Sequence, residues 1–187
     1  GIYARATWGQ YPATWGRRTV SVQGTAATAD GAVRVTASGY TGEARRSDAT
    51  FTDFEGNRAS MASGMWMEPS LVNVSVKAGD LALRFIHDGY TVGAQDGIGA
   101  VVPPVAARMA GWFAEARWPV AATSTLTLTP ELRYRRQYPW QVIDSASPMV
   151  FDKRGDHLEA GLRAAWKPAR WAELSGGVSG AANRAWV

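Results

Sequence analysis

Polar and apolar side chains alternate along residues 124 to 140, which read STLTLTPELRYRRQYPW. One parity holds Leu126, Leu128, Pro130, Leu132 and Tyr134, and the other holds Thr125, Thr127, Thr129, Glu131, Arg133 and Arg135. Successive side chains of a β-strand point to opposite faces of its sheet. The stretch therefore predicts a strand with one apolar face and one charged face.

The same alternation recurs along the chain. Residues 19 to 26, 112 to 118, 158 to 166 and 172 to 180 each place apolar side chains on one parity and polar or small ones on the other. Residues 2 to 8 predict a further strand. Residues 81 to 87 are less regular, because Ile86 shares the parity of Arg84, and His87 on the apolar parity predicts a position at the rim.

Short turns and long loops alternate between these strands. The predicted turns are Ala29-Asp30-Gly31, residues 77 to 80, residues 119 to 123 and residues 167 to 170. Residues 44 to 69, 88 to 108 and 137 to 156 show no period of 3.6 and predict long loops. An up-and-down meander then has its short turns at one end and its long loops at the other.

Two all-β folds produce this pattern. In a soluble β-sandwich or barrel the apolar faces form a core, whereas in a membrane barrel they meet lipid and the charges line the interior. The apolar parities are rich in Ala, Gly, Val and Thr, and they contain few of the large aliphatic side chains that fill a sandwich core. Charges of both signs share the polar parity, and Trp residues lie at strand ends, as in an interfacial girdle. Both observations favour the membrane barrel.

The predicted interior charge network comprises Arg84, Glu115, Arg117, Glu131, Arg133, Arg135, Glu159, Arg163 and Glu173. The predicted aromatic girdle comprises Trp112, Trp118, Trp166 and Trp171. Basic residues predicted at the long-loop end are Arg17, Arg18, Arg45, Arg46, Arg136, Lys153 and Arg154. These basic residues would either bind lipopolysaccharide phosphates, which suit guanidinium forks, or form a merely solvated rim.

The strands, turns, loops and girdle aromatics resemble those of bacterial outer-membrane β-barrel proteins as a class. The resemblance implies an antiparallel up-and-down transmembrane β-barrel of about 8 to 10 strands in the outer membrane of a Gram-negative bacterium. Residues 1 to 187 would form one β-barrel domain or a piece of a larger barrel. The ending AANRAWV departs from the terminal aromatic residue common in the class, and the opening GIYARATWG, without an initiator Met or a signal peptide, predicts a processed or truncated product.

Composition narrows the chemistry. The 20 Lys and Arg residues exceed the 16 Asp and Glu residues only slightly and are spread along the chain, so we expect no nucleic-acid partner. The absence of cysteine excludes disulfides and thiolate metal sites. No apolar run approaches the ~18 residues of a transmembrane helix. We expect neither a metal nor another cofactor.

Two candidate sites each have an ordinary structural interpretation as well. His87, Asp88 and a serine such as Ser145 or Ser147 would supply a hydrolytic triad, but the chain has no nucleophile-elbow motif. The stretch DFEGN at residues 53 to 57 offers oxygen ligands for Ca²⁺ without matching an EF-hand loop, and a polar surface turn is the simpler interpretation. The apolar stretches GMWMEPSLVNV and QYPWQVIDSASPMVF predict an inward-folded plug or a partner-binding patch.

The sequence thus favours a non-enzymatic outer-membrane β-barrel that acts as a pore, conduit or surface scaffold, with porin-like transport only if the barrel is wide. Its expected partners are outer-membrane lipid, lipopolysaccharide and other subunits of an envelope complex. The alternatives are a soluble β-sandwich or barrel that binds carbohydrate or protein, and a membrane-embedded lipid hydrolase.

Overall fold

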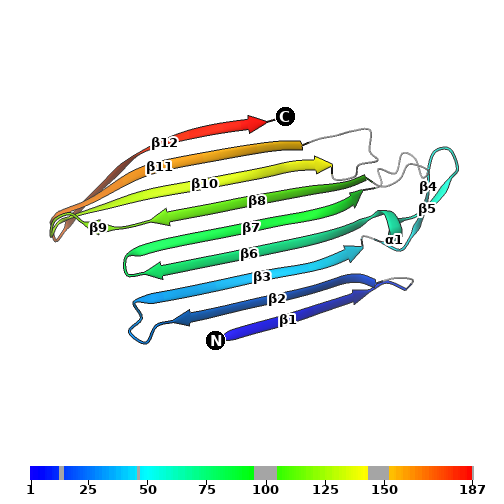
Figure 1. Ribbon diagram of the computed structural model, residues 1–187, viewed down its shortest axis with the longest axis horizontal. Helices are drawn as coiled ribbons and strands as arrows, with labels where there is room; N and C mark the ends of the chain where they lie inside the picture. The colour runs from blue at the N-terminus through cyan, green and yellow to red at the C-terminus, as the bar shows by residue number, and fades with distance from the viewer. Residues whose placement is uncertain (13–14, 46, 95–104, 143–151, 187) are drawn as a thin grey trace.

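Nine long strands run side by side across the molecule (Figure 1). The computed structural model describes residues 1–12, 15–45, 47–94, 105–142 and 152–186. The long strands are β1 (Ile2–Gln10), β2 (Trp15–Ala27), β3 (Val33–Arg45), β6 (Trp66–Ala78), β7 (Leu81–Ala94), β8 (Val105–Arg117), β10 (Leu126–Val142), β11 (Asp152–Ala169) and β12 (Ala172–Trp186). A two-residue strand, β9 (Val120–Ala121), pairs with the start of β10.

The long strands form one antiparallel up-and-down sheet, in the order β1-β2-β3-β6-β7-β8-β10-β11-β12. The predicted all-β meander is therefore confirmed. The described strands do not close into a barrel, because β1 and β12 lie at opposite borders of the sheet and each has one unpaired edge (Figure 1).

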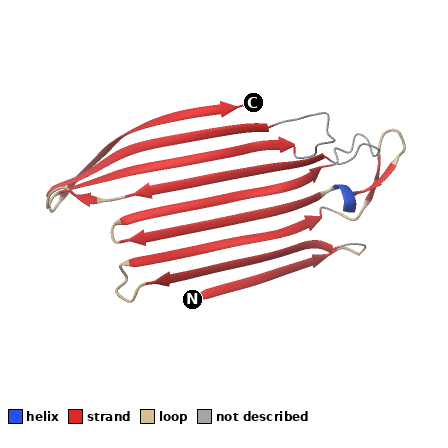
Figure 2. Cartoon of the chain, viewed as in Figure 1, coloured by secondary structure: helices blue, strands red, loops and turns tan. Residues whose placement is uncertain are grey.

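The turn chemistry explains why the strands reverse where they do. Gly31 and Gly79 adopt φ values of 71° and 55°, a left-handed conformation that other residues rarely take. Asp30 accepts hydrogen bonds from the Thr28 hydroxyl at 2.5 Å and from the Ala32 N–H at 3.0 Å. The connections β2–β3, β6–β7, β8–β10 and β11–β12 all lie at one end of the sheet, on the left of Figure 2, which we call the short-turn end.

At the opposite end, which we call the loop end, the strands run further than the sequence predicted. β7 continues to Ala94, β10 continues to Val142 and β6 already begins at Trp66. The apolar stretch at residues 64 to 74 and the first part of that at residues 137 to 151 are therefore mostly strand and not plug, while residues 143–151 lie outside the described part. Composition misled the prediction, because Gly, Pro and aromatic residues suggested loops where ladder pairing continues.

The connection from β3 to β6 contains a small structure of its own. Strands β4 (Thr50–Thr52) and β5 (Arg58–Ser60) form a hairpin, and the single-turn helix α1 (Met61–Gly64) follows it. The Ser60 hydroxyl accepts a hydrogen bond from the Ala62 N–H at 3.2 Å and so caps this helix. No helix among the described residues is long and apolar enough to cross a membrane.

The main sheet is a single layer without an enclosed core. Among the described residues, Ala107 is the one buried hydrophobic side chain and Asp53 the one buried charged side chain. A sandwich requires a second sheet over one face, and the described part of the chain contains only the β4–β5 hairpin besides the main sheet. Both faces of the main sheet are therefore available to the surroundings.

Candidate functional site

The register of the sheet aligns charged side chains into one row across four strands. Arg84 on β7 lies opposite Glu115 on β8, which lies opposite Arg133 on β10. Arg133 in turn lies opposite Glu159 on β11. Directly opposed residues on neighbouring strands have Cβ atoms about 5 Å apart, so this row places charges of alternating sign side by side. We call the surface that carries this row the charged face.

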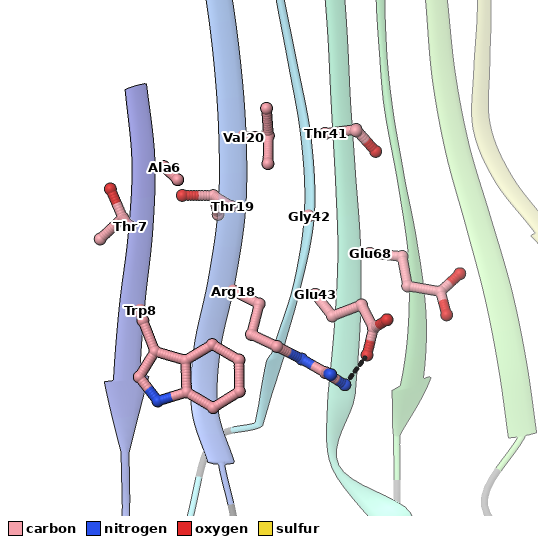
Figure 3. A pocket seen from close by; sticks show the side chains of 10 residues that line it. All are labelled: Ala6, Thr7, Trp8, Arg18, Thr19, Val20, Thr41, Gly42, Glu43 and Glu68. Carbon is pink, nitrogen blue, oxygen red and sulfur yellow. Dashed lines mark hydrogen bonds and ion pairs between the residues drawn. The ribbon is translucent and has the colours of Figure 1, made fainter. Parts of the chain in front are cut away.

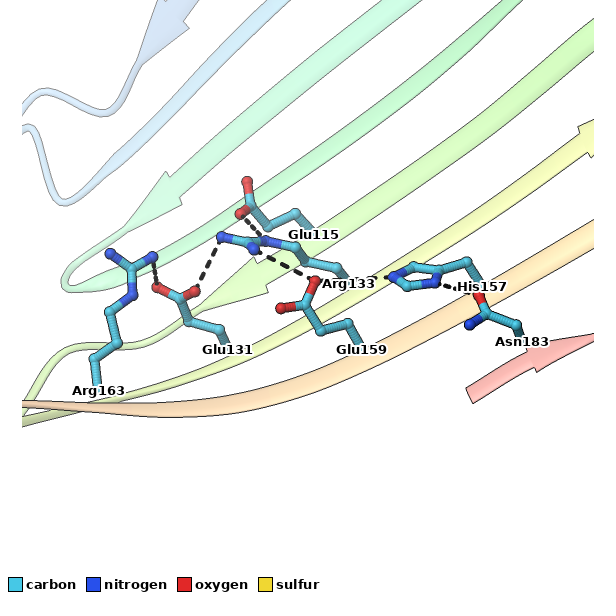
Figure 4. Close-up of polar contacts among 7 residues, drawn as sticks. All are labelled: Glu115, Glu131, Arg133, His157, Glu159, Arg163 and Asn183. Carbon is cyan, nitrogen blue, oxygen red and sulfur yellow. Dashed lines mark hydrogen bonds and ion pairs between the residues drawn. The ribbon is translucent and has the colours of Figure 1, made fainter. Parts of the chain in front are cut away.

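Arg133 is the centre of the row and contacts three carboxylates (Figure 4). Its Nε lies 3.0 Å from Glu115 Oε1, and its Nη2 lies 3.1 Å from Glu131 Oε2. Its Nη1 lies 3.5 Å from Glu159 Oε2. A planar guanidinium supplies several donors in fixed directions, so one Arg can hold three carboxylates that lysine could not hold in this geometry.

Further side chains extend the network along β11 and β12. Arg163 pairs with the second oxygen of Glu131, whose side chain is only 8% exposed. His157 Nε2 lies 3.9 Å from Glu159 Oε2, and His157 Nδ1 lies 2.6 Å from Asn183 Oδ1 (Figure 4). The carboxylates of this group are thus held by cations, which suits a structural brace better than general acid–base chemistry.

The predicted network is partly assembled. The structure brings together Glu115, Glu131, Arg133, Glu159 and Arg163. Arg117 lies opposite Glu131, and Arg135 lies opposite His157, on the same face. The Arg84 Nε donates to Asn73 Oδ1 at 3.5 Å, so its described hydrogen bond runs to a neutral partner.

Glu173 does not join this network. It lies at the short-turn end of β12, where its carboxylate pairs with Lys167 Nζ at 3.2 Å. Its parity was predicted correctly, but distance along the strand separates it from the other charges. The predicted network did not include His157 or Asn183. His157 shares the parity of Glu159, so the sequence did carry a signal for it. Asn183 lies beyond the predicted end of its strand.

The opposite surface carries the apolar residues, and we call it the apolar face. One row of directly opposed residues crosses the sheet on this face: Val35, Val76, Leu83, Ala116, Leu132, Ala160 and Gly180. Large side chains on it are open to the surroundings, as with Leu132 at 50% and Val178 at 75% exposure. An apolar surface that crosses a whole sheet is far larger than the patches usual on soluble monomers.

Tryptophans border the apolar face at both ends. Trp118, Trp166 and Trp171 lie at the short-turn end, with Trp171 89% exposed in the β11–β12 turn. Trp112 lies further from that end, near the middle of β8, where its ring stacks on His87 with centroids 4.0 Å apart. The predicted girdle of four is therefore divided between two levels.

Other tryptophans at the loop end were missed. Trp8 and Trp186 lie near the loop ends of β1 and β12. Trp8 shares a hollow of about 650 Å³ on β1, β2, β3 and β6 with Arg18, Glu43 and Glu68 (Figure 3). Trp8 lies inside the strand predicted at residues 2 to 8, on its apolar parity, which was a usable signal. Trp186 lies beyond the predicted end of its strand.

The predicted basic residues do not form one surface. Arg18 pairs with Glu43 at 3.1 Å, and Arg45 donates to the Ala62 carbonyl at 2.8 Å. Arg17 lies on the charged face, opposite Ala44. Lys153 lies opposite Trp140 in the ladder, and Arg46 lies outside the described residues. Only Arg136 and Arg154 lie close together on the apolar face, on the adjacent strands β10 and β11.

The residues of the hydrolytic triad considered from the sequence are not assembled in the described part of the chain. His87 lies on the apolar face, with Nδ1 3.0 Å from the Gly111 carbonyl oxygen, while Asp88 lies on the charged face. Ser145 and Ser147 lie outside the described residues.

The DFEGN stretch is the β4–β5 turn. Asp53 Oδ1 accepts hydrogen bonds from the N–H groups of Glu55 at 3.0 Å and Asn57 at 2.8 Å, and Gly56 has φ of 89°. The carboxylate therefore organises the turn itself. Within the described residues, no group of three or more His, Cys, Asp and Glu side chains is arranged to hold a metal ion.

Comparisons with protein-family models, curated proteins and solved structures gave no match for this chain. The two faces of the sheet and the residues that they carry are therefore the basis for a functional assignment.

Proposed function

We propose that this chain forms part of the wall of a transmembrane β-barrel, in the outer membrane of a Gram-negative bacterium. The apolar face meets lipid and the charged face lines the barrel interior. The protein works without catalysis, as a pore, conduit or surface scaffold. The observation that carries the proposal is a single-layer sheet with one continuous apolar face and one ion-paired charged face.

The energetics of burial support lipid as the cover of the apolar face. Covering a Leu, Val or Phe side chain is worth about 1.5 to 3 kcal/mol, and side chains of this kind lie on successive strands across the sheet. In water such a face would drive aggregation, whereas a bilayer covers all of it at once. Lipid also accepts small residues such as Ala160 and Gly180 without leaving cavities.

The height of the apolar face matches a membrane. On β11, ten residue steps separate Asp156, the charged residue that borders the apolar residues of this face, from Trp166 near the short-turn end. At about 3.3 Å per residue these steps span about 33 Å along the strand. A strand tilt of about 40° reduces this to about 25 Å, the height of the apolar band of membrane barrels.

The free edges of β1 and β12 support closure by further strands. Unpaired backbone N–H and C=O groups are not tolerated in lipid, so each edge needs a partner. Exposed edge strands are commonly protected by Pro or Lys, and neither strand contains either residue. Since β1 and β12 run in the same direction, a segment with an odd number of further strands can pair with both edges, and the number of added strands sets the width of the barrel (Figure 1).

Membrane extraction of the expressed full chain tests the proposal. The protein should sediment with membranes, resist extraction by alkaline carbonate, and migrate differently on gels before and after boiling. A protein that stays monodisperse in buffer without detergent would overturn the proposal and favour the soluble binding module.

A further inference from the structure

We propose that Arg136, Arg154 and Arg184 form a binding site for the phosphate of a lipid head group, at the loop end of the apolar face. The inference rests on the proposed orientation of this face toward lipid. The three arginines come from the neighbouring strands β10, β11 and β12. Arg184 was not among the basic residues that the sequence suggested.

The register gathers these arginines around one carboxylate. Arg136 on β10 lies opposite Asp156 on β11, and Asp156 lies opposite Arg184 on β12. Arg154 is two residues from Asp156 on the same strand and therefore on the same face. Asp152, two residues before Arg154, lies on this face as well. The three cations and two anions leave a formal excess of one positive charge.

The Asp156 carboxylate forms an ion pair with one of the three arginines, Arg136. Its Oδ1 accepts from Arg136 Nε at 2.8 Å and its Oδ2 accepts from Arg136 Nη2 at 3.1 Å, so both oxygens are used by a bidentate pair. No described carboxylate lies within ion-pair distance of Arg154 or Arg184. The Arg154 Nε is also shielded from solvent and has no hydrogen-bond acceptor among the described residues. A buried donor without an acceptor is unfavourable, so the described residues alone do not satisfy the Arg154 side chain.

The two remaining guanidinium groups both lie against one aromatic ring. The Arg154 Cζ lies 3.8 Å from the centroid of the Trp186 ring, and the Arg184 Cζ lies 5.5 Å from it. Cation–π contact orients both groups before a ligand arrives. Two guanidinium groups that share one ring repel each other, so an anion between them would lower their energy.

The surroundings select a lipid phosphate over a free anion. Leu158 lies two residues beyond Asp156 on the same face and is 46% exposed, and Val178 on β12 is 75% exposed. The site therefore lies at the border where the charged rim meets the apolar face. A ligand with a phosphate and an acyl chain can satisfy both surfaces, with the phosphate on the arginine forks and the chain along the leucine and valine side chains.

The experiment uses phosphatidic acid as the probe. The full chain is reconstituted into phosphatidylcholine nanodiscs with and without about 10% phosphatidic acid, and bound lipid is counted by native mass spectrometry. The double variant Arg154→Ala and Arg184→Ala should lose about tenfold or more in phosphatidic acid retention, because it removes the charge-assisted hydrogen bonds of two guanidinium groups.

The matched control is the double variant Arg5→Ala and Arg34→Ala, which removes the same charge from the charged face. It should retain phosphatidic acid like the unaltered chain. Equal retention of phosphatidic acid by the two double variants would refute the proposed binding site.

A second arm separates a lipid site from a free-anion site. Millimolar inorganic phosphate should displace little bound phosphatidic acid, and full displacement would overturn the assignment to a lipid. Resistance to alkaline extraction is measured on the same samples. If the variant inserts into the membrane and retains lipid like the unaltered chain, the binding site is refuted but the proposed function is not. If the unaltered chain fails to insert, the proposed function is refuted.

Discussion

At the scale of single residues, Arg133 has the largest structural role on the charged face. Three carboxylates, those of Glu115, Glu131 and Glu159, depend on its one guanidinium group. Removal of the guanidinium leaves like charges on adjacent strands without the cation between them. Lysine would restore the charge but not the three-way geometry.

Arg133→Ala should lower the free energy of unfolding by about 1 to 3 kcal/mol, since each of three partly screened ion pairs contributes up to ~1 kcal/mol. Urea unfolding in detergent micelles, followed by tryptophan fluorescence, measures this loss. Arg133→Lys should recover part of it. The control Arg5→Ala removes a charged-face arginine for which no ion pair is described, and an equal loss in that control would contradict the role of Arg133.

Asp30 gives a pH prediction at the same scale. The Thr28 hydroxyl, and then the Ala32 N–H, lower the pKa of this carboxyl from its usual value of 3.8. A depressed folded-state pKa means that ionised Asp30 stabilises the turn above its ordinary pKa, and that this stabilisation is lost as pH falls through the folded-state value. Carboxyl-carbon NMR should find the pKa below 3.8, and Thr28→Ala should raise it. An Asp30 pKa that Thr28→Ala leaves unchanged would refute the assigned cause.

At the scale of strands, alternation in the sequence was sufficient to predict which residues share a face. The charges of Glu131, Arg133 and Arg163 follow from parity alone. Parity says nothing about position along the strand, so Glu173 was wrongly grouped with them, and the group around Asp156 required the register between β10, β11 and β12.

The ends of the strands were the other weakness of the sequence prediction. Pro69 and Pro139 lie inside β6 and β10, where their composition suggested loops. Near Pro139 the ladder tolerates proline because its register shifts between Gln137 and Trp140. At Pro69 the ladder to β7 continues to the partner Tyr90, but the ladder to β3 has no pair at this residue, so β6 is paired on one side only there. Such a gap depends on the neighbouring strand and cannot be predicted from the composition of β6.

Neighbouring residues on β10 offer a direct comparison of the two faces. Leu128→Arg should destabilise membrane assembly by about 2 to 4 kcal/mol, the cost of Arg on the lipid side of a barrel near the midplane. Thr129→Arg adds the same group to the charged face and should be tolerated. The fraction of heat-modifiable protein on unboiled gels measures assembly, and similar fractions for the two variants would refute the assignment of faces.

At the scale of the whole molecule, the direction of the edge strands restricts how the sheet can be completed. β1 and β12 both run from the short-turn end to the loop end (Figure 1). An antiparallel neighbour of either edge must therefore run in the opposite direction. Two copies of this chain, inserted in the same orientation, would meet only through parallel strands. The sheet is most simply completed by a segment with an odd number of strands. The first and last strands of this segment then run from the loop end to the short-turn end and pair antiparallel with β1 and β12.

The orientation of the two faces can be measured on β2, since the cysteine-free chain accepts a single spin label at any position. Labels at Val20, Ser21, Val22 and Gln23 are compared in lipid vesicles for collision with oxygen and with a water-soluble nickel chelate. Oxygen should dominate at Val20 and Val22, and the nickel chelate at Ser21 and Gln23. Equal nickel accessibility at all four positions, or the opposite alternation, would contradict a sheet that turns its apolar face to lipid.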